Sequence, residues 1–295
     1  MTVEINLSGN NDIDGVLWGW SWGSTRPEGL ALTYSFPTAT TEYINDGYVS
    51  ITGFAAFTAA QQTAVTQLLG NIASFANLTF TLTANVDAIL RYGDATSVNY
   101  TNSSSVAGNV GDHAIPTATS NPPELGSPPF SAPYAQGDGW FNGYTNPQLG
   151  SFQYFDGLMH ETGHNLGLKH GHVTQVGHGV TFPTLPADHD SNEYSVMTYR
   201  QFPTDDPTNG DNAPNHPTTY MQDDIAALQY LYGADYGASA RNGNTTYTWS
   251  PTTGQESING VGQGAPNANF VFMTLWDGGW HRYLRLLKLH NQSLG

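Results

Sequence analysis

The segment from Thr58 to Phe75 has apolar residues three or four positions apart, which is the spacing of one face of an α-helix. This face consists of Val65, Leu68, Leu69, Ile72 and Phe75. The glutamines Gln61, Gln62 and Gln67 are expected to point away from it. The pattern therefore predicts a helix that packs on a sheet through a single apolar stripe.

Shorter apolar stretches predict strands. Alternation predicts a short first strand over residues 32–37, after an exposed leader over residues 1–16. Leu78–Leu82 and Ala88–Tyr92 are also predicted to be strands. Residues 96–137 are rich in Ser, Asn, Pro and Gly, which favours a long irregular loop with room for one short strand.

Helical spacing returns twice in the second half of the chain. We expect one helix over about residues 152–168 and another over about residues 222–231. The second of these would bury Ile225, Leu228 and Leu231. Helices and strands together, in a chain of 295 residues, leave room for one large domain or two modest ones.

Composition excludes several classes of function. Eight basic residues against 24 acidic ones give a net charge of −16, so a nucleic-acid-binding surface is not expected. The chain has no run of about 18 apolar residues, and we expect no membrane span. Cysteine is absent, which removes disulfides and thiol chemistry. The first eleven residues have neither the basic nor the apolar region of a secretory signal.

His160, Glu161, His164, Gly167 and His170 follow the spacing H-E-x-x-H-x-x-G-x-x-H. Residues four apart lie on one helix face, so the first two histidines can bind one ion, with the glutamate placed to act on a metal-bound water. The third histidine reaches that ion only if the chain turns, and glycine enters the left-handed conformation without a Cβ penalty. Three neutral nitrogens with an open coordination position predict a catalytic zinc site.

This pattern arises by chance on the order of a few times in a hundred thousand such chains, which disfavours a core helix with solvated histidines. His172 and His178 are expected to be solvated loop histidines. The histidines without a partner at ligand spacing are His113, His189 and His216. Asp156 has two interpretations: it supports a ligand, or it complements the helix dipole in the first turn.

A second motif lies downstream, at Ser195-Val196-Met197-Thr198-Tyr199. Together with the histidine motif it resembles the metzincin metalloproteases, whose Met-turn passes beneath the zinc site. The Gly-Leu-Lys-His around the third histidine and the DDIAALQYLYG run at residues 223–233 resemble, more narrowly, the serralysin family of secreted bacterial endopeptidases. The resemblance covers residues 17–279 and is loose over residues 96–137.

The resemblance implies an α+β fold of the α/β metzincin kind. This fold has a twisted, mostly parallel sheet with an edge strand, three main helices including the zinc-binding active-site helix, and a Met-turn. Ala88–Tyr92 stands where the family's edge strand pairs with extended substrate. The run Gly137–Phe141 resembles a strand entry in the family.

The resemblance also assigns roles to the motif residues. It makes His160, His164 and His170 the zinc ligands, and Glu161 the general base that passes a proton from the attacking water to the leaving amine. Tyr199 is implied to be a weak fifth zinc ligand that leaves the metal and hydrogen-bonds the tetrahedral intermediate; ordinary core packing is the alternative. We interpret Met197 as a hydrophobic floor, because zinc prefers nitrogen and thiolate donors.

Residues 236–280 resemble the start of the family's C-terminal β-domain. The resemblance implies one calcium site there, and the residues of this chain at its positions are Arg241, Gly243, Thr245, Asp277 and Gly279. A further aspartate of that site is replaced here by Arg282. A cation in place of a carboxylate is expected to abolish or greatly weaken calcium binding.

Residues 281–295 hold three of the eight basic residues and none of the glycine- and aspartate-rich repeats that would follow in the family. We expect a truncation before those repeats and an out-of-frame tail, without the C-terminal export signal that family members use in place of an N-terminal one. A native basic amphipathic ending is the alternative. The other reading frames of the gene after Gly279 would decide between them.

These observations predict an extracellular, monomeric zinc endopeptidase that hydrolyses extended proteins or peptides. Its parts would be a leader (1–16), a catalytic domain (17–235), a truncated β-domain (236–280) and the tail (281–295). One competing hypothesis is a secreted calcium-dependent adhesion or binding protein with a vestigial metal site, against which Glu161 argues. Another is a misfolded, inactive chain whose apolar surface at residues 270–275 causes aggregation.

Overall fold

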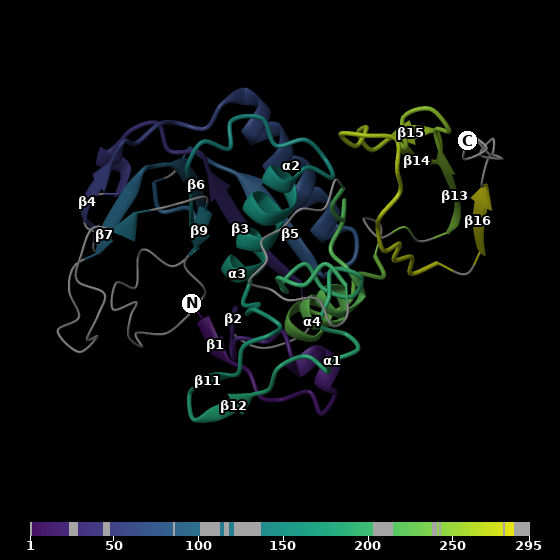
Figure 1. Cartoon of the computed structure of the whole chain (residues 1–295), viewed down its shortest axis with the longest axis horizontal. Coiled ribbons are helices and arrows are strands. Elements are labelled where there is room, and N and C mark those ends of the chain that lie inside the picture. Colours follow the sequence, from purple (N-terminus) through teal and green to yellow (C-terminus); the bar gives the residue numbers. More distant parts are fainter. Residues whose placement is uncertain are drawn as a thin grey trace.

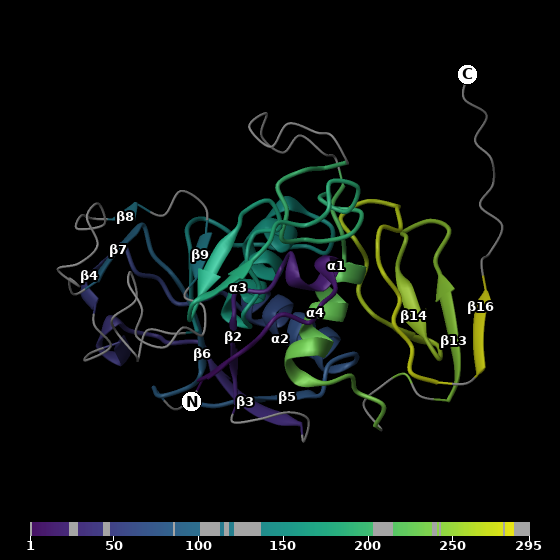
Figure 2. The same cartoon turned by 90° about the horizontal axis from the view of Figure 1, so that it is seen from below.

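The computed structural model describes residues 2–23, 29–43, 48–84, 86–100, 113–114, 118–120, 137–202, 215–237, 241, 243–279 and 281–285. Two regions are visible in Figures 1 and 2: a main body that contains the largest sheet and the helices, and a smaller sheet near the C-terminus that stands to one side. None of the helices in these ranges is both long and apolar enough to cross a membrane.

The largest sheet has five strands in the order β5-β3-β6-β10-β9. They are β3 (Leu30–Ser35), β5 (Leu78–Leu82), β6 (Leu90–Asp94), β9 (Ala118–Ser120) and β10 (Asp138–Phe141). The first four strands in spatial order are parallel, and β9 runs antiparallel to β10. The predicted mostly parallel sheet is confirmed.

The expected position of the edge strand is wrong. β6 lies between β3 and β10, and all five of its residues are buried, as in a strand covered on both faces. In the described part of the chain the edge beyond β10 is formed by β9, which comes from the stretch expected to be mainly loop. Short strands in a segment rich in glycine and proline have too little periodicity to be recognised from sequence.

The helix α2 (Ala59–Ala73) matches its prediction, and its apolar face is buried. Thr58 and Gln61 form a capping box at its start, in which each side chain bonds the other residue's backbone N–H. The expectation for Gln61 is wrong: this side chain is fully buried, and its Nε2 donates to Oδ2 of Asp94 at 2.9 Å. Helical spacing alone does not show that a capping side chain at the start of a helix is buried in the protein.

The histidine-bearing helix begins as a π-helical segment, η2 (Gln153–His160), and continues as α3 (Glu161–Asn165). The hydroxyl of Tyr220 donates to the carbonyl oxygen of Met159 at 2.6 Å, close to the point where the two segments join. α2 contacts η2, and α3 contacts β9 and β10, so the helices cover the sheet beside its β9 edge. The third predicted helix is α4 (Gln222–Tyr232).

The N-terminal segment packs on the main body, so its expected exposure is wrong, while its role as a leader stays a prediction. β1 (Thr2–Glu4) pairs with β2 (Trp20–Trp22), and the short helix α1 (Asn11–Asp14) packs near α4. Ile5 and Val16 are buried. The exposure was predicted wrongly because alternation is weak here, although Ile5 and Val16 join the apolar core.

Two small sheets flank the main one. β4 (Tyr48–Thr52), β7 (Ser97–Tyr100) and β8 (His113–Ala114) form a three-stranded sheet, again with strands from the expected loop. β11 (Gln175–Gly177) and β12 (Val180–Phe182) form a hairpin after the histidine motif. A 3₁₀ turn, η1 (Thr40–Tyr43), precedes β4.

The smaller C-terminal sheet has the order β15-β14-β13-β16. Its strands are β13 (Asn244–Trp249), β14 (Glu256–Ile258), β15 (Val261–Gly262) and β16 (His281–Arg285). Residues 270–275 form no strand: Phe272 packs against the core, and its carbonyl oxygen accepts from Thr218 N–H at 2.9 Å. Residues 286–295 lie outside the described residues, and the origin of the tail stays a prediction.

Candidate metal centre

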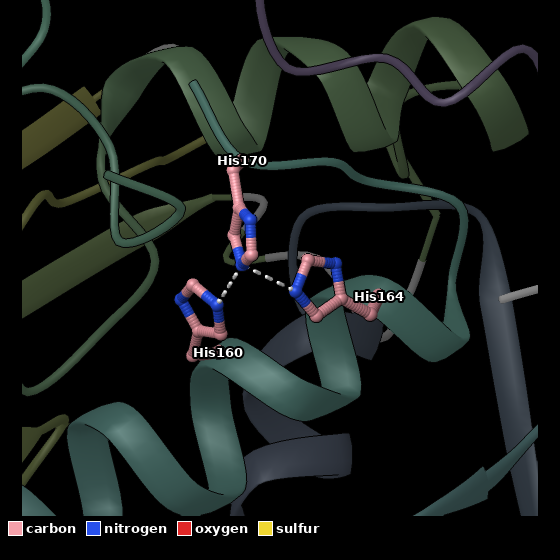
Figure 3. A group of neighbouring side chains, drawn as sticks. All are labelled: His160, His164 and His170. Carbon is pink, nitrogen blue, oxygen red and sulfur yellow. Dashed lines mark hydrogen bonds between the residues drawn. The ribbon is translucent and has the colours of Figure 1, made fainter. Parts of the chain in front are cut away.

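Three histidine rings meet at one point above the helix. His160 and His164 come from η2 and α3, and His170 comes from the loop that follows (Figure 3). Nε2 of His170 lies 3.1 Å from Nε2 of His160 and 3.1 Å from Nε2 of His164. Tetrahedral zinc with Zn–N bonds of about 2.0–2.1 Å separates its nitrogen ligands by roughly 3.3 Å. The predicted ligand set is therefore assembled with a spacing that fits such an ion.

The other ring nitrogens show which tautomers are present. Nδ1 of His160 lies 2.9 Å from the carbonyl oxygen of Val196, and Nδ1 of His164 lies 2.8 Å from that of Leu168. A carbonyl oxygen only accepts, so both Nδ1 atoms carry the proton and both Nε2 atoms present a lone pair to the shared point. Both lone pairs face Nε2 of His170, so either a proton on that nitrogen or a bound cation can be shared by the three rings.

Burial favours the neutral rings that a metal requires. It lowers the pKa of His160, and it lowers the pKa of His164 to about 3, with help from the charge of His160. The pKa of His170 is lowered as well, first by burial and then by the neighbouring histidines. A metal therefore meets little competition from protons at neutral pH. His160, His164 and His170 can therefore bind a metal ion.

Gly167 makes the turn that brings His170 back to the helix. Its φ is +98°, and a Cβ at this position would lie 2.3 Å from the carbonyl oxygen of Trp20. The N–H of Trp18 donates to the carbonyl oxygen of Gly167 at 2.9 Å, and Leu17 pairs with Leu168 in an isolated bridge. The residue must therefore be glycine for two reasons, its backbone conformation and the close approach of the N-terminal segment.

Lys169, which the sequence analysis did not single out, holds the loop of the third ligand. The side chain is 2% exposed, and its ammonium donates to the carbonyl oxygens of Gly15, His170 (3.2 Å) and Val173 (2.8 Å). The backbone N–H of Lys169 donates to the carbonyl oxygen of Val16 at 2.8 Å. Burial lowers the pKa of Lys169 to about 7, although three acceptors match the three donors of the charged form.

Tyr199 lies against the histidines and is 46% exposed. Its hydroxyl is 3.0 Å from Nε2 of His170, and its ring stacks on that of His160 with centroids 5.8 Å apart. Burial of the hydroxyl, with the negative charge of Glu161 as a smaller cause, raises the pKa of Tyr199 to about 12. Ordinary core packing does not describe this side chain, because nearly half of it faces solvent.

Glu161 follows His160 directly and is 9% exposed. Besides burial, its charge and that of Asp156 both contribute to the raised pKa of Tyr199. Asp156 accepts a hydrogen bond from the hydroxyl of Tyr144 at 3.3 Å, and its charge opposes the lowering of the His160 pKa. Both interpretations of Asp156 therefore stay open.

The segment 195–199 contacts both the histidine-bearing helix and the ring of His160. Met197 is fully buried, and a Cβ on Gly163 would lie 2.6 Å from its Sδ atom, so this helix residue must be small. Ser195 Oγ donates to Oδ1 of Asp224 at 2.6 Å, and Val196 N–H donates to Oδ2 at 2.8 Å. Asp224 of α4 thus fixes the segment whose carbonyl oxygen orients His160.

Two other histidines differ from their prediction. His172 stacks on the rings of His170 (5.4 Å between centroids) and Tyr199 (4.7 Å), and its Nδ1 is buried without a hydrogen-bond partner among the described residues. His178 has a side chain that is 8% exposed, and its Nε2 donates to the carbonyl oxygen of Ile5 at 2.8 Å. Neither is a solvated loop histidine, because the N-terminal segment and Tyr199 cover them.

The remaining histidines lie apart from the centre. His189 interacts with Asp223 through Nδ1 at 2.8 Å, and His216 is buried and stacks on Phe155 with centroids 5.0 Å apart. The side chain of His113 lies outside the described residues. In the described part of the chain, the three motif histidines form the one group of acidic or histidine side chains arranged to hold a metal.

The residues of the expected calcium site also meet. A Cβ on Gly279 would lie 2.5 Å from the backbone nitrogen of Gly243 and 3.0 Å from Oδ1 of Asp277, and Thr245 N–H donates to the carbonyl oxygen of Gly243 at 3.0 Å. The guanidinium of Arg241 lies near the ring of Tyr247, 5.7 Å from its centroid.

The carboxylate of Asp277 is already engaged. Tyr247 donates to Oδ2 at 2.6 Å, and the N–H of Gly279 donates to Oδ1 at 2.7 Å. Strand β16 pairs Arg282 with Thr245, while the side chain of Arg282 lies outside the described residues. Weak or absent calcium binding at this position stays a prediction.

Comparison with known proteins agrees with the geometry of the centre. The chain is 30% identical over 262 residues to the metallopeptidase AprA of Pseudomonas marginalis, covering 85% of this chain and 48% of that protein. It is 28% identical to serralysin B and to serralysin G of Dickeya chrysanthemi, each covering 88% of this chain. No protein-family model matches the chain. The chain spans about half the length of these curated relatives. Because the similarity extends over most of its own length and includes the three-histidine centre, the chain belongs to the serralysin family.

Proposed function

We propose that the chain is a zinc-dependent endopeptidase in which His160, His164 and His170 hold the metal and Tyr199 is a weak fifth ligand. The observation that carries this proposal is the convergence of three Nε2 atoms, those of the buried His160 and His164 and of the half-buried His170, the first two held as lone-pair donors by carbonyl oxygens. Three neutral imidazoles with an open position are the ligands of a catalytic zinc site. When bound, zinc would supply the Lewis acidity that lowers the pKa of water to about 7.

Glu161 acts as the general base in this proposal. Its carboxylate accepts a proton from the water that attacks the peptide carbonyl carbon, and it then delivers that proton to the amine nitrogen as the C–N bond breaks. Its low exposure supports this role, because a carboxylate shielded from bulk water exchanges its proton with the substrate in preference to solvent.

Tyr199 stabilises the negative oxygen that develops on the substrate. A pKa of about 12 keeps its hydroxyl protonated at neutral pH, so the group can donate a hydrogen bond. Its exposure leaves room for the side chain to move away from His170 when substrate enters. Met197 and its neighbours serve as the Met-turn, a floor that fixes the ligand rings from below.

Protein or peptide substrates are proposed on the basis of the relatives, which are named metallopeptidase and serralysin. An extended chain has a sheet edge available at β9, since in the described residues β9 pairs only with β10. We also propose an extracellular monomer, as for a protease that meets its substrates outside the cell.

The test is zinc stoichiometry by elemental analysis together with hydrolysis of a quenched, unfolded protein substrate. We expect about one zinc per chain in the parent and in Glu161→Gln, with cleavage by the parent alone. Glu193→Gln, which removes an exposed carboxylate, is the matched control and should cleave like the parent. Zinc binding without cleavage by the parent would favour a binding protein with a vestigial site, and absence of zinc would refute the metal centre.

A further inference from the structure

A cavity of about 560 Å³ lies between α2 and the C-terminal sheet. Gln67, Gly70 and Asn71 of α2 line one side, and Glu256 and Ile258 of β14 line the other. None of the three metal-binding histidines lines it. Its volume is within the range of about 300–1,000 Å³ that is typical of sites for small molecules. The two regions that form it are separate in Figures 1 and 2, so the cavity belongs to their junction.

Two side chains that line the cavity have an oxygen without a hydrogen-bond partner among the described residues. These atoms are Oε1 of Glu256 and Oδ1 of Asn71, and both are buried. Glu256 as a whole is only 8% exposed. A buried acceptor without a donor is costly, and a carboxylate more so than an amide. Both oxygens are shielded in this conformation, so a bound donor, above all a cationic one, would satisfy them once the two side chains rotate towards the cavity.

A positive charge lines the same cavity. The guanidinium of Arg241 lies over the ring of Tyr247, and its charge acts on Glu256 without satisfying Oε1 of that carboxylate. A cationic and an acidic side chain on the walls of one cavity match a ligand that carries both charges. Ile258, Phe270 and Met273 add apolar surface to the wall.

We propose that this cavity binds a zwitterionic ligand of the amino acid or short-peptide class. Its ammonium group would donate to Glu256 and Asn71, its carboxylate would accept from Arg241, and an apolar side chain would contact Ile258 and Phe270. The chemistry differs from that of the histidine centre, and the proposal does not depend on proteolytic activity. A ligand that contacts α2 and β14 together would also stabilise the junction.

The experiment is a calorimetric titration of the full chain with three probes of similar shape: L-leucine, 3-methylbutylamine and 3-methylbutanoate. We expect saturable binding of leucine and at least tenfold weaker binding of the two singly charged probes. Glu256→Gln and Arg241→Gln should each weaken leucine binding by about tenfold, the equivalent of one lost charge-assisted hydrogen bond. Glu193→Gln, an equal charge change at an exposed position, should leave it unchanged.

A second readout separates this site from the metal centre, where an amino acid can also act as a ligand. Labelled methionine methyl groups report on both places, because Met273 lines the cavity and Met197 packs against Gly163, next to the metal-binding His164. Leucine should shift the Met273 signal. No saturation, a shift confined to Met197, or equal affinity for leucine and the amine would each overturn the proposal. The methyl experiment needs only the parent chain, so it remains decisive if a variant fails to fold.

Discussion

The ammonium group of Lys169 donates a hydrogen bond to the carbonyl oxygen of Gly15, 154 residues earlier in the chain. The same lysine is the direct neighbour of His170, and its ammonium also donates to the carbonyl oxygen of that ligand. The N-terminal segment and the loop of the third ligand are thus joined through one buried cation. The position of His170 depends on residues that sequence patterns placed outside the catalytic unit.

Lys169→Met should destabilise the chain and weaken metal binding. Methionine fills a similar volume but leaves three carbonyl oxygens without their donor. We expect a loss of roughly 2 kcal/mol or more in the free energy of unfolding, because buried acceptors that lose their partner cost about 1–3 kcal/mol each. Urea unfolding and zinc competition with a chelator would measure the two effects.

The control for that variant is Thr174→Met, which introduces the same side chain at an exposed position in the same loop. It should change the unfolding free energy by less than about 0.5 kcal/mol. Equal stability of the lysine variant and this control would show that the ammonium does not hold the loop.

Gly167→Ala should be much more damaging than Gly179→Ala. Both glycines have positive φ, +98° and +86°, so both substitutions carry a conformational cost of about 1–2 kcal/mol. A methyl group at Gly179 meets nothing within 4 Å, whereas at Gly167 it would lie 2.3 Å from the carbonyl oxygen of Trp20. The difference between the two melting temperatures therefore measures the clash alone. Similar melting temperatures would contradict the close packing of the N-terminal segment on the ligand loop.

Acid should destabilise the metal-free chain through His164. The folded-state pKa of His164 is about 3, below the ordinary 6.5, so between these values the unfolded chain binds more protons. Stability therefore falls as the pH drops from 6.5 towards 3, by up to about 1.4 kcal/mol per pH unit for one such histidine. Urea unfolding of the metal-free protein at several pH values gives the slope.

Other groups titrate in the same range, and a variant is needed to isolate His164. Burial raises the pKa of Asp224 to about 7, which contributes with the opposite sign: stability present at low pH is lost as the pH rises through that window. The difference in slope between the parent and His164→Asn cancels the contribution of Asp224, which both proteins contain, and reports on His164 together with its effect on the pKa of His170. A variant with the slope of the parent would refute the assignment to His164.

Prediction from the sequence was most accurate where a helix and its ligands follow from the spacing of residues within one element. The spacing at Val65, Leu68 and Ile72 identified α2, and the histidine motif identified the ligands, because helix geometry converts spacing directly into proximity. Prediction failed where the position of a strand or side chain depends on contacts between segments that are distant in the sequence. The central place of β6 depends on strand order, which local alternation does not encode.

The same limit applies at the centre itself. Lys169 is a single charged residue with no periodic signal, and its role appears only when Gly15 is beside it. His172 looked like a loop histidine, since stacking on Tyr199 depends on how two loops meet. The one hint available in the sequence was a lysine directly beside a ligand, in a chain with only eight basic residues.

Tyr199→Phe should separate the role of the hydroxyl from that of the ring. Phenylalanine can keep the stacking on His160 and His172, so zinc affinity should change by no more than a fewfold. The lost hydroxyl removes the proposed donor to the developing oxyanion, which in comparable sites lowers kcat by about 10²–10³ with little change in KM. Tyr236→Phe, at a tyrosine that is 68% exposed and lines no part of the centre, is the matched control and should retain the kcat of the parent. If Tyr199→Phe retains full kcat, the hydroxyl near His170 has no part in catalysis; a lower kcat accompanied by loss of zinc would make it a structural ligand instead.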